Sequence, residues 1–446
     1  MFFAAFALLV TGTARMLTRS SARQLAASLA VVGVALSIVG LAQRATFNGK
    51  IYGFWELSQG GAPFGPFINR NHFAGWMLMV VPLTVGLLAS VVSRAMAGVR
   101  PQWRNRILWF ATPDANKVIL TAFAVMTMAL ALVATLSRSG ISAFAAAMVF
   151  ASIGMVTRRS VSAHRSRWIV PGYLALVCIV VMSWVGVDRI AARFSSPPSV
   201  TAEGRRAIWA DTRHMVNDFA LTGTGLNTFG SAALFYQTSL RGSHMREAHN
   251  DYLQVAAEGG VLAGVPIVLS VAALITGIRR RLRDDVGSIW WIRIGAVSGL
   301  LAIAAQSLVE FSLQMPGNAA LFAVLCGIAL HDGGRAASQR LPDALALGSV
   351  EPPLPTLAAS KKVVSISKGH RSLDFSFDEQ SPRAPESRPN FEPTLLDGTE
   401  DRRQLISRRD VRPAPRTARV AAPGRQLAGA VALLSLLLLL LLILGF

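Results

Sequence analysis

Apolar runs of about 20 residues recur along this 446-residue chain and are separated by short polar segments. A helix needs about 20 residues to cross the roughly 30 Å hydrocarbon layer of a bilayer, and it bonds its own backbone groups internally. The pattern therefore predicts membrane-spanning helices near 25–43, 73–93, 118–136, 140–156, 168–187, 253–278, 289–309, 318–331 and 427–446. A further run at 2–12 has no basic residue before it and no small-residue cleavage site. We therefore expect it to be a first helix rather than a cleaved signal peptide.

The composition agrees with this pattern. Hydrophobic residues make up 52% of the chain, charged residues make up 15%, and the mean hydropathy is +0.45. A water-soluble domain could not bury so much apolar surface in one core. We expect an all-α polytopic integral membrane protein with about ten transmembrane helices. The two cysteines, Cys178 and Cys326, fall inside predicted spans, which supports neither a disulfide framework nor a thiolate metal site.

The distribution of arginine orients the predicted spans. Short basic connections follow the first, third, fifth and seventh helices, and such connections remain in the cytoplasm by the positive-inside rule. The net charge of +20 is explained by this topology signal and by a basic tail, so it requires no nucleic acid partner. The remaining connections are expected on the outer side of the membrane, around 44–72, 137–139, 187–252 and 310–317.

The chain divides into three predicted parts. Residues 1–332 form a multi-span membrane domain with one long outer loop at 187–252. From 333 to 426 the sequence is rich in proline, serine and arginine and poor in aromatic residues, which predicts a disordered cytoplasmic linker. Residues 427–446 contain an unbroken leucine run and are predicted to form a C-terminal transmembrane anchor.

A histidine stands where the long outer loop meets the next span. His249, Asn250 and Asp251 lead directly into the helix predicted at 253–278. Histidine titrates near neutral pH, so His249 is a candidate general base, although it could also start the helix or bind a metal. The metal interpretation is weak, because His244 lies off the i,i+4 face and the outer side carries no ligand pattern of the His-Glu-x-x-His kind.

The same loop is rich in arginine, which its predicted translocation does not explain. Guanidinium groups bind phosphate oxygens through paired hydrogen bonds and keep their charge at any relevant pH. Arg205 and Arg206 are the strongest candidates, because Trp209 follows at helical spacing and the three predict a short amphipathic helix at the membrane interface. For most other arginines of the loop, surface ion pairs are the simpler explanation.

Three further polar clusters fall on the same predicted face. Arg138 interrupts an apolar stretch from 118 to 156. An ionisable group so close to the hydrocarbon is a functional candidate, although its side chain could also extend to the headgroups. A second cluster, Asn69-Arg70-Asn71-His72, directly precedes the span predicted at 73–93. A third, Glu310-Phe311-Ser312, directly follows the span predicted at 289–309. A reaction on a lipid-linked substrate at the outer surface requires its polar residues to lie on one face of the membrane in this way.

Together these motifs resemble the O-antigen ligase/polymerase superfamily, the bacterial membrane glycosyltransferases that take a glycan from undecaprenyl pyrophosphate on the periplasmic side. The resemblance covers about 60–330 and implies a GT-C-like helical fold, a periplasmic loop at 187–252 and a multi-pass location in the bacterial inner membrane. It also implies that no cofactor and no metal is needed. The motifs that carry it are Asn69-Arg70-Asn71-His72-Phe73-Ala74-Gly75, Ser137-Arg138-Ser139-Gly140, Arg206 with Trp209, Gly223-Thr224-Gly225 with Phe229, His249-Asn250-Asp251-Tyr252-Leu253-Gln254, and Gln314-Met315-Pro316 with Asn318.

The resemblance implies a catalytic role for three residues. His249 takes a proton from the acceptor hydroxyl as that oxygen attacks the anomeric carbon, which predicts inversion there. Arg138 and Arg206 hold the pyrophosphate and stabilise the charge that develops as it leaves.

A further set is expected to bind the substrates or to position the base. Arg205 and Arg70 help to hold the pyrophosphate, and either Asp251 or Glu310 orients the imidazole or pairs with an arginine. The complete set is Arg205, Arg70, Asn69, His72, Asp251 and Glu310.

The expected partners are an undecaprenyl-pyrophosphate-linked glycan donor, membrane lipids, and a glycan, lipid A core or protein as acceptor. The motifs do not separate a ligase from a polymerase or from a protein glycosyltransferase. The alternative is a transporter or flippase for polysaccharide or lipid-linked glycan, which predicts ionisable residues at the midplane and two related halves. A non-enzymatic scaffold is a further alternative, but it leaves the outer arginine and histidine clusters unexplained.

Overall fold

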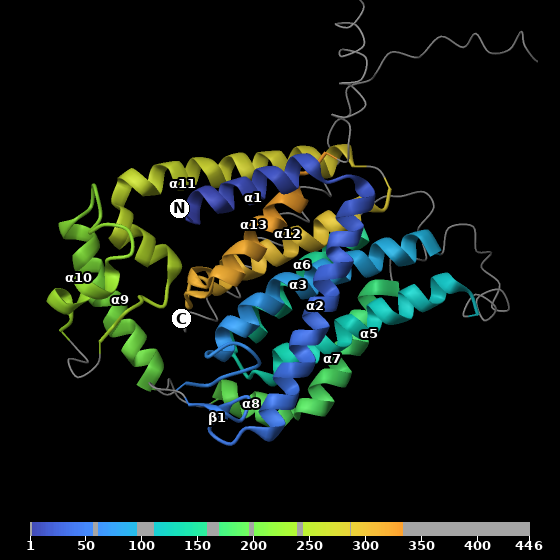
Figure 1. Ribbon diagram of the computed structural model, residues 1–446, viewed down its shortest axis with the longest axis horizontal. Helices are drawn as coiled ribbons and strands as arrows, with labels where there is room; N and C mark the ends of the chain where they lie inside the picture. The colour runs from blue at the N-terminus through green and yellow to red at the C-terminus, as the bar shows by residue number, and fades with distance from the viewer. Residues whose placement is uncertain are drawn as a thin grey trace, which may run out of the picture. The chain divides into compact units, whose positions relative to one another are not determined.

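The structure is a computed structural model, and it describes residues 2–56, 61–95, 111–157, 169–195, 200–238, 244–285 and 287–332. The described residues are mostly helical (Figure 1). The linker predicted at 333–426 and the anchor predicted at 427–446 lie outside the described residues.

The elements follow one another along the chain as α1 (Phe2–Met16), α2 (Arg19–Thr46), β1 (Lys50–Ile51), β2 (Trp55–Glu56), α3 (Arg70–Ala95), α5 (Pro113–Ala134), α6 (Arg138–Thr157), α7 (Ile169–Val185), α8 (Val187–Ser195), α9 (Val200–Asp218), α10 (Phe229–Tyr236), α11 (Asp251–Asp284), α12 (Ile289–Gln306), the 3₁₀ helix η2 (Ser312–Gln314) and α13 (Pro316–Leu330). Strands β1 and β2 pair antiparallel as a hairpin.

Each span predicted within the described residues corresponds to a helix. Helices α2, α3, α5, α6, α11 and α12 are long and apolar enough to cross a membrane. Helices α1, α7 and α13 are also apolar but shorter. The chain is therefore a helical, multi-pass membrane protein. The total of about ten spans and the GT-C relation stay predictions.

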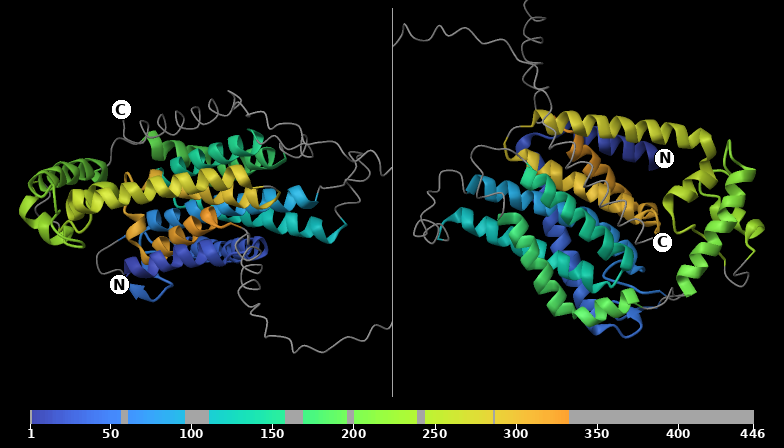
Figure 2. Two further views of the ribbon diagram at one scale, coloured as in Figure 1. Left: turned by 90° about the horizontal axis from the view of Figure 1, so that it is seen from above. Right: turned by 180° about the vertical axis from the view of Figure 1, so that it is seen from behind.

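Helix α3 lies at the centre of these helices. It packs against α12, α5, α2, α6 and α13. Figure 2 shows the helices from two further directions. Its most apolar stretch is completely buried among the other helices. A helix that is hydrophobic on all sides suits such a central position.

Glycines bring the backbones of α3 and α12 together. A Cβ atom added to Gly86 would lie 3.0 Å from the Cα of Gly295, and one added to Gly299 would lie 2.7 Å from the carbonyl oxygen of Met79. Small residues at such interfaces let membrane helices approach closely and gain packing contacts. This packing positions the end of α12, from which the chain continues into Glu310.

Gly75 lies in α3 and faces the segment that follows α12. A Cβ at this position would lie 2.8 Å from Oε1 of Gln306 and 2.8 Å from Oγ of Ser312. Because these side chains would have to shift, we expect Gly75→Ala to lower the free energy of unfolding by about 1–3 kcal/mol. Thermal unfolding of the purified protein in detergent measures this loss.

The matched control for that substitution is Gly264→Ala in α11. No heavy atom lies within 4 Å of a Cβ placed there. We expect this variant to keep its stability or to gain up to about 1 kcal/mol, since alanine is the better helix former. An equal loss in both variants would show that the contacts of Gly75 are unimportant.

The stretch predicted as a long loop at 187–252 contains the helices α8, α9 and α10. Ile208 and Met215 of α9 pack with Phe229 and Ala233 of α10 and with Ala257 of α11 in a small hydrophobic cluster of their own. The short helix predicted around Arg205 and Trp209 is part of the 19-residue helix α9. The outer location of this stretch stays a prediction.

Helix α11 is kinked at Gly260, where φ is 53° and ψ is −156°. The kink is tied to the turn after α9, because the N–H of Thr224 donates to the carbonyl of Ala257 at 2.9 Å and the N–H of Gly225 donates to that of Glu258 at 3.0 Å. Gly223 adopts a φ of 68°, a left-handed conformation that glycine enters without strain. The first turns of α11 therefore belong with α9 and α10, whereas the apolar remainder is largely exposed, as a lipid-facing helix is.

A buried arginine joins α12 to the C-terminal end of α13. The side chain of Arg293 is 1% exposed, and its Nε donates to Oδ2 of Asp285 at 2.6 Å. Its terminal nitrogens donate to the carbonyl oxygens of Ile328, Ala329 and His331. The last carbonyls of a helix have no partner inside it, so Arg293 caps α13.

Candidate functional site

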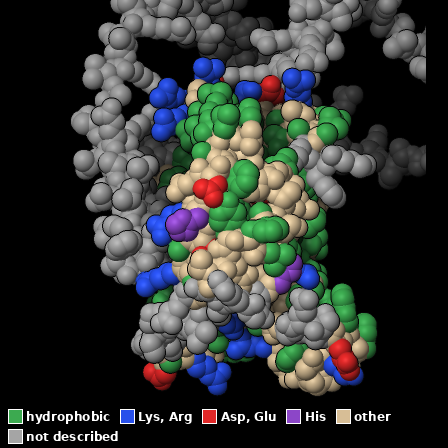
Figure 3. Space-filling model, turned by 90° about the vertical axis from the view of Figure 1, so that its left-hand side faces the viewer, with side chains coloured by type: hydrophobic (Ala, Val, Ile, Leu, Met, Phe, Trp, Pro, Cys, Tyr) green, Lys and Arg blue, Asp and Glu red, His purple; other side chains and the backbone are tan. Residues whose placement is uncertain are grey.

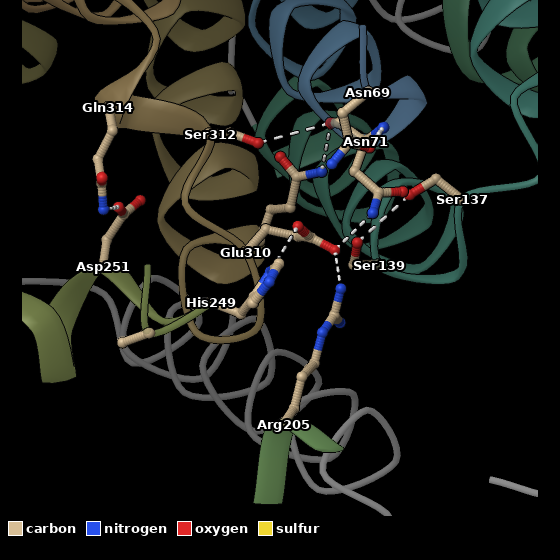
Figure 4. A network of polar contacts seen from close by, with 12 residues as sticks. Asn69, Asn71, Ser137, Ser139, Arg205, His249, Asp251, Glu310, Ser312 and Gln314 are labelled. Carbon is tan, nitrogen blue, oxygen red and sulfur yellow. Dashed lines mark hydrogen bonds and ion pairs between the residues drawn. The ribbon is translucent and has the colours of Figure 1, made fainter. Parts of the chain in front are cut away.

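A buried carboxylate joins three segments at one end of α3 and α12. The side chain of Glu310, between α12 and η2, is 1% exposed. Its Oε1 accepts a hydrogen bond from Nη2 of Arg205 at 2.6 Å and another from Nδ2 of Asn71 at 2.6 Å. Its Oε2 lies 3.9 Å from Nδ1 of His249 (Figure 4). Residues from the start of α3, from α9 and from the start of α11 therefore meet at Glu310.

The backbone of His249 adopts a conformation that is uncommon for residues other than glycine. Its φ is 52°, and the chain on both sides is fixed. The carbonyl of Ala248 accepts from Nε1 of Trp209 at 2.9 Å, and Oδ1 of Asn250 accepts from the N–H of Leu253 at 3.0 Å, which caps α11. These bonds hold a strained residue in place and direct its ring to Glu310.

Two imidazole rings contact the same aromatic side chain. The ring of Phe311 lies 4.9 Å from that of His249, at an interplanar angle of 76°, and 4.6 Å from that of His72, at 78°. His72 is 6% exposed and therefore lies deeper than His249, whose side chain is 29% exposed. His249 is the histidine of this pair that a substrate can reach.

Side-chain amides fix the entry to α3. The carbonyl of Asn71 accepts from Nε2 of Gln306 at 3.1 Å, and the carbonyl of His72 accepts from Nδ2 of Asn318 at 3.1 Å. Oδ1 of Asn69 accepts from the N–H of Asn71 at 2.9 Å. Asn69 therefore binds the backbone at the start of α3. The Gln306 and Asn318 amides hold this part of the backbone, so that the Asn71 side chain reaches Glu310.

Asp251 has partners other than His249. Its Oδ2 accepts from Oγ of Ser307 at 2.8 Å, and its Oδ1 accepts from Nε2 of Gln314 at 3.2 Å. The sequence left open whether Asp251 or Glu310 orients the imidazole or pairs with an arginine. The structure brings Glu310 to both the imidazole and Arg205, whereas Asp251 joins α11 to the segment after α12.

The neighbouring arginines of α9 have different surroundings. Arg205 is partly buried against Glu310, and Arg206 is exposed. Residues four apart lie on one helix face, so Arg205 shares the face of Trp209, which is held by Ala248. The sequence analysis gave Arg206 the leading role and made Arg205 a helper; the geometry instead puts Arg205 into the polar network.

The two remaining predicted arginines begin helices. Arg70 is the first residue of α3 and Arg138 the first of α6, and both are partly buried. The start of α6 packs on α3, since a Cβ added to Gly140 would lie 2.8 Å from the Cβ of Ala74. Arg138 therefore lies near the first turns of α3, which contain Asn71 and His72.

Four residues that contact the predicted ones have no role that the sequence predicts: Asn71, Phe311, Ser307 and Gln314. Glu310 and Asn71 lie 239 residues apart along the chain, so no local spacing connects them.

Charge neighbours keep Glu310 ionised despite its burial. Burial, the largest single influence, raises the pKa of this carboxyl group, but His249 and Arg205 together outweigh it and hold the pKa of Glu310 below its ordinary value of 4.5. At neutral pH the group is therefore a carboxylate, which only accepts hydrogen bonds.

Figure 3 shows the molecule from the side on which α9, α10 and the start of α11 lie. Histidine, basic and acidic side chains interrupt the hydrophobic surface on this face. Among the residues that the structure describes, no three His, Cys, Asp or Glu side chains gather closely enough to hold a metal ion. Metal independence itself stays a prediction.

Residues 123–268 match the model of a family described as O-antigen ligase. This part of the chain is similar to the O-antigen ligase family. The matched region extends from α5 into α11 and includes Arg138, Arg205, Arg206 and His249. The O-antigen ligase match ends before Glu310 and begins after Asn71, which the fold brings to the same site. No curated protein matches the chain.

Proposed function

We propose that this protein is a membrane glycosyltransferase that transfers or polymerises glycan from an undecaprenyl-pyrophosphate donor on the periplasmic side of the bacterial inner membrane. The acceptor is a hydroxyl group on a glycan, a lipid A core or a protein. The match to the O-antigen ligase family supports this class of reaction. The observation that carries the proposal is that His249, within the matched region, adjoins a buried carboxylate and is still partly accessible.

His249 acts as the general base in this proposal. It removes the proton of the acceptor hydroxyl while that oxygen forms a bond to the anomeric carbon of the donor sugar. The bond between that carbon and the pyrophosphate oxygen breaks, and its electron pair leaves with undecaprenyl pyrophosphate. Attack from the face opposite the leaving group inverts the configuration.

Arginines bind the leaving group. Arg138 and Arg206 hold the pyrophosphate oxygens, and Arg70 assists, because guanidinium groups form strong paired hydrogen bonds with phosphate and offset the charge that develops on it. Arg206 is exposed and can reach a ligand, and Arg70 and Arg138 begin adjoining helices. Arg205 is already bonded to Glu310, so we assign it no phosphate contact.

The test is a transfer reaction with purified, EDTA-treated protein in nanodiscs. The substrates are an undecaprenyl-pyrophosphate oligosaccharide and each class of acceptor in turn. We expect metal-free release of undecaprenyl pyrophosphate together with a glycosylated product of inverted anomeric configuration. The identity of the product separates ligation, polymerisation and transfer to protein.

A control reaction without acceptor measures simple hydrolysis of the donor. If the donor is bound but moves across a sealed vesicle membrane without being consumed, the protein is a transporter and the proposal is wrong. A product of retained configuration would contradict direct attack by the activated hydroxyl.

A further inference from the structure

The two oxygens of Glu310 have different surroundings. Oε1 accepts two hydrogen bonds of 2.6 Å, from Arg205 and from Asn71. Oε2 is buried and has no hydrogen-bond partner, and Nδ1 of His249, also buried and without a hydrogen-bond partner, lies 3.9 Å away. Two orphaned polar atoms therefore face each other at a distance about 1 Å longer than a hydrogen bond.

This arrangement distinguishes the two ring nitrogens of His249. A carboxylate offers only acceptor atoms, so the nitrogen that faces it must carry the hydrogen. In a neutral imidazole the other nitrogen, Nε2, then holds the free electron pair. The side chain is 29% exposed although Nδ1 is buried, so its exposed part lies away from Glu310.

The surrounding residues keep this orientation. The φ of 52° at His249 and the edge contact with Phe311, at 4.9 Å between ring centres, limit rotation of the imidazole. Arg205 and Asn71 hold the carboxylate from the opposite side. The orientation of the ring therefore depends on partners from three different segments.

We propose that Glu310 is a positioning residue, which holds His249 with Nδ1 protonated so that Nε2 is the atom that takes the proton of the acceptor hydroxyl. This inference rests on the proposed function for the identity of the acceptor. As the hydroxyl proton moves to Nε2, the ring becomes positively charged and Nδ1–H donates to Oε2 of Glu310. The proton later leaves from Nε2 to solvent. Arg205 is the counter-charge of Glu310 and not a ligand of the pyrophosphate.

The first measurement is the pH dependence of His249 modification by diethyl pyrocarbonate, which acylates the neutral ring. Mass spectrometry of the peptide that contains His249 measures the modified fraction in intact protein in nanodiscs. For Glu310→Gln we expect the half-modification point to move down by about one pH unit, since the charged ring loses its anionic neighbour. For Arg205→Gln we expect a shift to higher pH, because a repelling cation is removed.

The second measurement is the pH–rate profile of glycan transfer by the same variants. Glu310→Gln should lower the maximal rate about 100-fold or more, because a base in the wrong tautomer loses most of its effect. Glu310→Asp keeps the charge and should recover part of the rate, with its acidic limb near that of the wild type. Glu247→Gln is the control, since this carboxyl group interacts with the charge of His249 but is not the ion-pair partner of Nδ1, and it should keep the maximal rate.

The two measurements separate the possible failures. Opposite shifts in Glu310→Gln and Arg205→Gln support the inference even if the wild type transfers no glycan, in which case only the proposed function fails. A folded Glu310→Gln variant with an unchanged modification profile overturns the inference. If that variant does not fold, Arg205→Gln decides: an upward shift supports the inference and an unchanged profile overturns it.

Discussion

The His249→Ala variant is expected to transfer glycan about 100 to 10,000 times more slowly than the wild type, which is the usual contribution of a positioned general base. No other described histidine combines contact with the Glu310 network and partial exposure: His72, which also contacts Phe311, is only 6% exposed. Without an imidazole at this position, the acceptor hydroxyl must attack while it still holds its proton. Donor affinity should change little, since the proposed phosphate ligands are arginines.

Single-turnover transfer from the lipid-linked donor measures the rate, and donor binding is measured separately. His244→Ala is the matched control, because His244 lies in the same stretch but is exposed, with its ring Nε2 2.9 Å from the carbonyl oxygen of Gly230. This control should transfer at the wild-type rate. If His249→Ala also does so, another group takes the proton and the assigned chemistry is wrong.

The helices could be predicted from the sequence because each membrane-spanning run is itself apolar. The run at 73–93 became α3 (Arg70–Ala95), and the run at 289–309 became α12 (Ile289–Gln306). Burial in lipid or in a protein interior selects for the same residues along the whole segment, so composition alone locates such helices.

Features that depend on contacts with other segments could not be predicted in this way. The polar stretch at 187–252 reads as a loop, but α9 and α10 fold because their few apolar residues pack on each other and on α11. Likewise, the apolar run at 253–278 predicts one continuous helix, although the glycine pair Gly259-Gly260 permits a break. The kink at Gly260 results from hydrogen bonds to the turn at Gly223, Thr224 and Gly225.

The candidate site shows the same division. His249, Arg205 and Glu310 could be chosen one by one, since polar or ionisable residues at the ends of apolar spans are unusual. Which carboxylate pairs with which arginine could not be decided between Asp251 and Glu310, because Arg205 lies 105 residues from Glu310 in the chain. Trp209 lies four residues after Arg205 and three after Arg206, and both spacings share a helix face, so the sequence does not tell which of the two arginines faces Glu310.

Arg293→Ala is expected to destabilise the protein by about 3–5 kcal/mol, the usual result of removing one partner from a buried ion pair. The substitution leaves the Asp285 carboxylate, whose side chain is 13% exposed, without its cation. It also removes the donors to the carbonyls of Ile328, Ala329 and His331, and so uncaps α13. Thermal or chemical unfolding in detergent measures the loss.

The matched control is Arg281→Ala, in the last turn of α11. The Arg281 side chain is 35% exposed and lies 3.9 Å from Asp332, so its removal should cost at most about 1 kcal/mol. Arg293→Met with Asp285→Leu should recover part of the lost stability, because the pair is then replaced by apolar side chains and no buried charge remains. Arg293 lies at the opposite end of α12 from Glu310, so folded Arg293→Ala protein should keep the wild-type pH–rate profile. A variant as stable as Arg281→Ala would show that the buried arginine does not hold α12 and α13 together.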